Sequence, residues 1–208
     1  MKFIKLQLLI VALLFFAATS AFASLSYTVS VDTASLNGQN GYLYFQYIPV
    51  NAAVSTATVS GFATNGTLGA QDTVDVVNGS AVTGTLPGTV VFANTNGIND
   101  YDHAIQFGNM MNFLLSFSNP APGGQDGGSS TFSFGLFADA VGNIPLLNTT
   151  GILGSVPGTL FTVSLDNSGT AAAQILTANT AGVPIPAAFW PMGSGLVGLG
   201  VIRRRKLK

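Results

Sequence analysis

Asp100 and Asp102 have the clearest potential for chemistry in this sequence, because they place two carboxylates two positions apart. In an extended chain such residues point to the same side, and Asn99 and backbone carbonyls add oxygens nearby. Calcium takes about six to eight oxygen ligands, so the pair predicts a calcium site. Asp72 and Asp75 are candidates for completing it from another loop. The alternative interpretation is that these Asp residues lie in turns and bond to their own backbone.

Catalytic chemistry has little support in the sequence. His103 is the only histidine, Cys is absent, and no G-x-S-x-G pattern occurs. A zinc site of ordinary composition therefore cannot be assembled, and a glycosidase-like pair of Asp has no pattern behind it. We predict that the protein is not an enzyme and has no cofactor, with calcium as the one candidate ligand and a hydrolase kept as a third hypothesis. His103 is expected to be a polar loop residue.

Tyrosines give a second binding hypothesis. Tyr42, Tyr44 and Tyr47 lie close together in the segment YLYFQYI, and rings on a sheet face could form part of a stacking platform for sugars. The same segment is apolar at successive positions, which favours a central strand with its tyrosines in the core. Both interpretations stay open, and core packing is the favoured one.

Alternation of apolar and polar residues predicts strands along most of the chain. The predicted strands are Leu25 to Val31, Tyr42 to Ile48, Ala57 to Phe62, Thr73 to Val77, Val82 to Leu86, Thr89 to Ala93, Ala104 to Phe107, Asn112 to Ser118, Thr131 to Phe137, Leu160 to Leu165 and Gln174 to Ala178. Asn-Gly and Pro-Gly turns separate many of them. Short strands at this spacing predict an all-β fold, an antiparallel β-sandwich of jelly-roll type. Residues 120–130 are expected to form a mobile loop between two strands.

Charge is divided sharply along the sequence. All seven Lys and Arg residues lie within residues 2–5 or 203–208, and all eight acidic residues are Asp and lie between these ends. Residues 24–182 therefore carry no cation to neutralise phosphates, so we expect no binding to nucleic acid. Cys is absent, and a body of about 159 residues must be held together by burial alone.

The first residues have the pattern of a secretory signal peptide. Lys2 and Lys5 precede an apolar core at residues 8–18, and Ala21 and Ala23 form a small-x-small cleavage site. We predict export through the secretion translocon and removal of residues 1–23 by signal peptidase.

Residues 183–208 combine a proline motif, an apolar stretch and a basic block. The proline motif consists of Val183, Pro184, Ile185, Pro186 and Ala187, and the basic block of Arg203, Arg204, Arg205 and Lys206. The 20 uncharged residues from Val183 to Ile202 match the length of a membrane-spanning helix. Basic residues stay on the cytoplasmic side of a membrane. The pattern predicts a C-terminal transmembrane helix with the rest of the chain outside.

This order of elements resembles the PEP-CTERM sorting signal of Gram-negative bacteria, in its VPxPA variant. The resemblance implies an inner-membrane intermediate that an exosortase-type membrane protease cuts near the proline motif. The protein would then pass to the cell surface or the exopolysaccharide matrix of a biofilm. A permanent membrane anchor is the alternative interpretation.

The sequence thus predicts four parts. They are a signal peptide (1–23), a β-sandwich domain (24–166), a C-terminal strand with a spacer (167–182), and a sorting signal with a transmembrane segment (183–208). The expected function is that of an exported structural or adhesive component of the cell surface or extracellular matrix. The alternative is a carbohydrate-binding module that recognises exopolysaccharide.

Overall fold

The computed structural model describes residues 25–72, 81–118, 120–121, 123–147, 157–176 and, for the backbone, 180–184. Several of the predicted features lie outside these residues: the signal peptide with Ala21 and Ala23, the strand at residues 73–77, and the tail from Ile185 through the basic block at 203–206. Within the described residues no helix is long and apolar enough to span a membrane.

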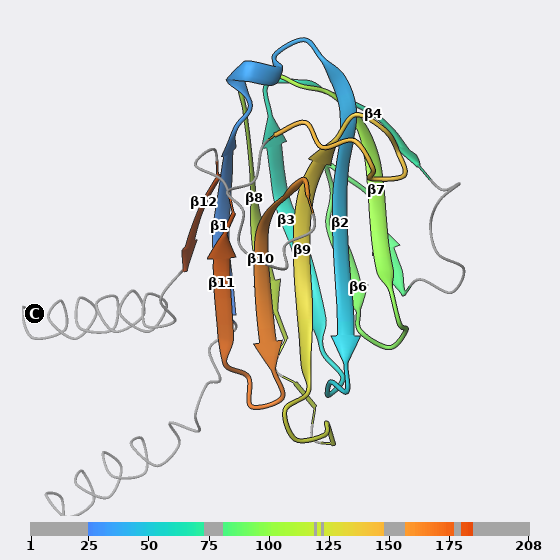
Figure 1. Ribbon diagram of the computed structural model, residues 1–208, viewed down its shortest axis with the longest axis vertical. Helices are drawn as coiled ribbons and strands as arrows, with labels where there is room; N and C mark the ends of the chain where they lie inside the picture. Colours follow the sequence, from blue (N-terminus) through green and yellow to red (C-terminus); the bar gives the residue numbers. More distant parts are fainter. Residues whose placement is uncertain are drawn as a thin grey trace, which may run out of the picture.

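The described chain is all-β and forms two six-stranded antiparallel sheets (Figure 1). Sheet A contains, in order, β12 (Thr180–Pro184), β1 (Leu25–Asp32), β8 (Met110–Phe117), β3 (Thr56–Thr64), β6 (Val90–Ala93) and β5 (Val82–Gly84). Sheet B contains β11 (Ala171–Ile175), β10 (Thr159–Asp166), β9 (Ser129–Phe137), β2 (Asn40–Val50), β7 (Asn99–Gln106) and β4 (Thr67–Asp72). A single turn of 3-10 helix, η1 (Ala34–Leu36), links β1 to β2.

Aromatic side chains from both sheets meet in a common core. Phe45 of β2 contacts Phe113 of β8, with ring centroids 5.6 Å apart, and Tyr47 contacts Phe117 at 6.0 Å. At the other side of the core, Tyr27 of β1 packs against a phenylalanine of β10 at 6.1 Å. Edge-to-face arrangements of this kind add to the stabilisation from burying apolar area. The strand layers that overlap in Figure 1 are therefore held together by ring packing.

The alternation in the sequence predicts most of these strands but misses three features. β4 and β12 were not expected, and β7 begins at Asn99, five residues before the expected start at Ala104. β12 includes Val183 and Pro184, which pair with Thr28 and Tyr27 of β1. The first two residues of the proline motif are thus part of sheet A.

The glycine-rich segment at residues 120–130 is tied to its neighbours rather than left without contacts. The side chain of Asn167 donates to the carbonyl of Gln125 at 2.6 Å and accepts from the amide of Ala53 at 2.6 Å. Gly124 and Gly128 lie so close to Asn167 that a Cβ atom at either would come within 2.6 Å of its amide. The small residues of this segment allow it to close around one polar side chain.

Candidate functional site

The outer face of sheet B, the face turned away from the other sheet, holds Asp100, Asp102, Tyr42 and Tyr44, four of the residues that the sequence singles out. Tyr101 and Ile105 of β7 belong to the core. Because side chains alternate along a strand, Asp100, Asp102 and Ala104 point to the outer face. Directly paired residues share a face, and Asp102 is paired with Tyr44 of β2. The register therefore brings strands β2, β7 and β4 together into one surface.

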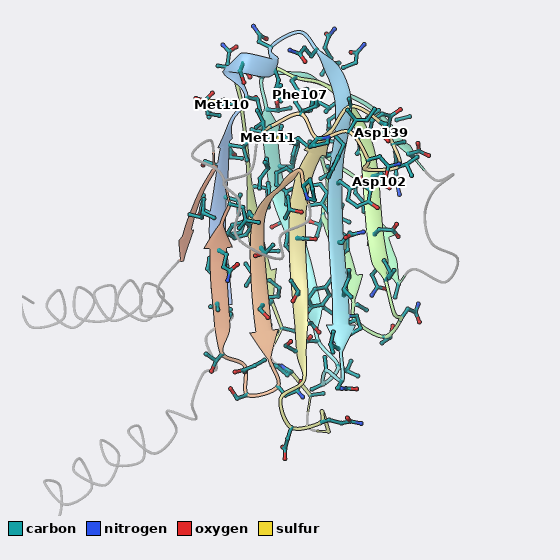
Figure 2. All side chains as sticks on the ribbon, viewed as in Figure 1. Asp102, Phe107, Met110, Met111 and Asp139 are labelled. Carbon is teal, nitrogen blue, oxygen red and sulfur yellow. The ribbon has the colours of Figure 1, made fainter. Side chains whose placement is uncertain are left out.

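Asp100 and Asp102 lie in the middle of a strand, so the alternative interpretation of them as turn residues is wrong. Asp100 is 3% exposed and Asp102 is 1% exposed, and Figure 2 labels Asp102 in the upper part of the view. Asp72, at the end of β4, is the direct cross-strand partner of Asp102. The fold thus gathers three of the four expected calcium ligands on adjacent strands, and Asp75 lies outside the described residues.

The carboxylates alone do not make a metal site. Within the part of the chain that the structure describes, no group of three or more His, Cys, Asp or Glu side chains is arranged to hold a metal ion. Calcium would need further oxygens besides those of Asp100 and Asp102. No Lys or Arg occurs anywhere between residues 6 and 202 to offset these buried carboxylates. The calcium site accordingly stays a prediction.

The three tyrosines of β2 separate according to the face they occupy. Tyr47 is fully buried, and its hydroxyl lies 2.7 Å from that of Ser55. Burial raises the pKa of Tyr47. Tyr42 and Tyr44 are half-buried on the outer face, where the hydroxyl of Tyr44 accepts a hydrogen bond from Gln46 at 3.2 Å. Core packing, favoured for all three, is wrong for Tyr42 and Tyr44.

His103 is a buried strand residue and not the loop residue that the sequence suggested. Its side chain is 3% exposed and stacks on Tyr101, whose hydroxyl lies 2.8 Å from the Nδ1 atom. The ring also bonds to the backbone of Gly69 in β4. Burial lowers the pKa of His103, and the bond to Gly69 opposes this shift. His103 therefore connects the core to the β4 edge and does not face solvent as a catalytic base.

Two hollows open on the outer face of sheet B. The larger has a volume of about 500 Å³ and lies over β2, β7 and β4, with Tyr42, Ala104 and Gln106 among its lining residues. The smaller has a volume of about 110 Å³ and lies beside Tyr44 and Gln46. The alternation in β2 could have placed Asn40, Tyr42, Tyr44 and Gln46 on one face. Sequence reasoning missed Gln106 and Thr67 because only the register brings them there.

A scan against protein-family models found no match for this chain, and searches of curated proteins and of solved structures found none either.

Proposed function

We propose that the protein is an exported structural or adhesive component of the cell surface or extracellular matrix. The observation that carries this proposal is the division of charge. All seven cations fall within the two expected targeting segments, while the region between them contains eight Asp and no Lys or Arg. A body whose charged side chains are all acidic repels its own copies, and this net charge keeps it in solution among other surface components.

We also propose that the body of the protein, with its two antiparallel sheets, is a β-sandwich of jelly-roll type. Support comes from the nested order of strand pairing, in which β1 pairs with β8, β2 with β7 and β3 with β6. Such a chain folds back on itself so that successive pairs fall alternately in the two sheets.

The route to the surface follows from the sequence pattern of residues 183–208. A signal peptidase and then an exosortase-type membrane protease would act on the chain, with a membrane-bound intermediate between the two steps. A structural role in an exopolysaccharide matrix, as in a biofilm, is consistent with the absence of Lys and Arg from the body.

Recognition of exopolysaccharide is the second candidate function. It is favoured by one observation, the presence of Tyr42 and Tyr44 on the outer face of sheet B beside two hollows. Aromatic rings with amide and hydroxyl neighbours are suited to sugars, which present both apolar and hydrogen-bonding surfaces.

Fractionation of the cells that produce the protein tests the main proposal. Antibody detection should find the protein in the surface or matrix fraction, released with extracellular polysaccharide. Disruption of the tail by Pro184→Ala together with Pro186→Ala should retain it in the inner membrane. Recovery of the wild-type protein from the cytoplasm would contradict the proposal.

A further inference from the structure

The larger hollow on sheet B is built from three adjacent strands whose register is fixed. Thr67 of β4 and Asn40 of β2 are both paired with Gln106 of β7, so these three exposed side chains form one polar row across the sheet. The next row on the same face begins with Tyr42, which is paired with Ala104. An aromatic ring, two amides and one hydroxyl therefore surround a single depression.

The hollow is deep at its centre because the residues that line it there, Gly69 and Ala104, have little or no side chain. Ala104 lies between Tyr42 and β4, and a Cβ atom at Gly69 would lie 3.0 Å from the Cβ atom of Ala104. The pairing of β4 with β7 is interrupted between Leu68 and Gln71, as in a β-bulge, and bulges commonly redirect side chains next to binding sites. The interruption leaves room above Ala104.

The same interruption is connected to the core through His103, which bonds to the backbone of Gly69 from the inner face. The floor is therefore braced from below by a buried side chain. Preformed hollows of about 300–1,000 Å³ are typical of small-ligand sites, and the volume of about 500 Å³ found here lies within this range.

The smaller hollow extends the surface along β2. It has a volume of about 110 Å³ and is lined by Tyr44, Gln46 and Ser133 among others. Tyr42 and Tyr44 are two residues apart on β2, and the hollows lie on either side of this strand, the larger toward β7 and β4 and the smaller toward β9. A ligand that occupies both hollows has to reach across β2, which favours a polysaccharide chain over a free monosaccharide.

Charge narrows the class of polysaccharide. Asp102 lies one row from the floor, directly opposite Tyr44 and Asp72, and the body contains no Lys or Arg to attract an anion. With Asp72 partly exposed beside this row and no Lys or Arg in the body, nothing on this face attracts carboxylated, sulfated or phosphorylated sugars. Neutral sugar units present uncharged hydroxyls, which suit the amides and the hydroxyl of the rim.

We propose that the outer face of sheet B binds a neutral polysaccharide, with one sugar unit held in the hollow between Tyr42, Ala104 and the row formed by Asn40, Gln106 and Thr67. This inference rests on polysaccharide recognition, the second candidate function above, and assigns its site and its ligand class. Tyr42 supplies the apolar wall, and Ala104 provides the space.

Affinity electrophoresis of the full-length protein in mild detergent tests the assignment. Native gels would contain galactomannan, dextran or laminarin as neutral probes, and alginate as the anionic probe. We expect retardation by at least one neutral polysaccharide and none by alginate. Tyr42→Ala should weaken the apparent affinity about tenfold or more, as expected for the loss of a central aromatic contact. Ala104→Gln, which fills the floor and keeps the ring, should do the same.

Gln174→Ala is the matched control, because Gln174 is exposed on β11 at the opposite edge of the same sheet. It should leave the retardation unchanged, and thermal melting of each variant would confirm that it is folded.

Retardation by a neutral probe that survives both Tyr42→Ala and Ala104→Gln would overturn the site but not polysaccharide recognition. Absence of retardation by every neutral probe would overturn both. Retardation by alginate would overturn the charge argument. The proposed role at the cell surface is tested separately, by the cell fractionation described above.

Discussion

At the scale of single residues, the protein buries ionisable side chains in strand β7 although its body contains no Lys or Arg. His103 is buried in β7 between Tyr101 and the backbone of Gly69, and Asp100 and Asp102 are buried on the opposite face of the same strand. The sequence identified Asp100 and Asp102 as candidate calcium ligands and His103 as the only histidine. It could not show their burial, because the run Asn-Asp-Tyr-Asp-His has the composition of a turn, and the flanking strands β2 and β4 impose the extended conformation.

His103 should make stability depend on pH. Burial lowers its pKa in the folded protein, so below about pH 6.5, the ordinary value for His, the unfolded chain binds a proton more readily than the folded one. Stability is then fully present above about pH 6.5 and decreases as the pH falls toward the folded pKa. Melting temperatures should decline between pH 7.5 and 5.5.

His103→Gln is the test variant, because it removes the titrating group from the core. Its melting temperature should be lower at pH 7.5 and should change less over this interval. Asp166 does not interfere, because hydrogen bonds from Ser168 and Thr170 lower its pKa, and its contribution is lost only at more acidic pH. A decline of equal steepness in the variant would assign the pH dependence to other groups.

Calcium binding is the second test at this scale. If calcium binds only the folded state at Asp100 and Asp102, stability should rise by about 1.4 kcal/mol when free calcium is about ten times Kd. Thermal melts of the full-length protein with calcium and with chelator would show the shift. The double variant Asp100→Asn, Asp102→Asn should lose it, and Asp126→Asn, in an exposed loop, should keep it. Identical wild-type melts in both buffers would remove calcium from the account.

Strands were predictable where apolar and polar residues alternate, as in Leu25–Asp32 and Thr159–Asp166. β4 was missed because its residues, TLGAQD, include a glycine and few apolar side chains. Its strand conformation comes from pairing with β7. β12 was missed because Val183 and Pro184 were assigned to the proline motif. Its pairing with β1 depends on a partner about 150 residues away in sequence, which no local pattern reveals.

Asn167 provides the test at the scale of elements, because its side chain joins the turn after β10 to two other segments, residues 51–53 and the loop that contains Gln125. It bonds to Ala53, to Gln125 and, at 3.3 Å, to the carbonyl of Asn51. Asn167→Ala should lower the free energy of unfolding by about 1–2 kcal/mol, since each hydrogen bond contributes roughly 0.5–1.5 kcal/mol. Urea denaturation measures this change.

Hydrogen exchange should locate the same effect. The amide of Ala53 loses its acceptor in Asn167→Ala and should exchange faster, whereas Asn143→Ala, in an exposed loop, should alter neither stability nor this amide. Unchanged exchange at Ala53 would show that the loop is held by its backbone bonds alone.

The whole molecule combines a two-sheet body with one sign of charge and two basic terminal segments. Separation of the charges was evident from the sequence, and so was the all-β class. The hollow on sheet B was not, because it depends on which strands become neighbours and on the irregularity in β4.

Charge also predicts what the body should fail to bind. Without Lys or Arg it cannot release counterions from a polyanion, and it gains nothing from an anionic membrane surface. In salt titrations, residues 24–184 should associate neither with duplex DNA nor with phosphatidylserine vesicles near physiological ionic strength. Association that weakens as salt is added would contradict the surface chemistry described for this body.

Intact-mass measurement on protein recovered from the native cell surface tests the central claim most directly. The claim is that the chain is exported and sorted through a tail that is then removed. The predicted mass lacks residues 1–23 and also lacks Arg203 to Lys208, with a C-terminus near the proline motif. A mass that retains the basic block would contradict processing and leave the permanent membrane anchor as the interpretation of the tail.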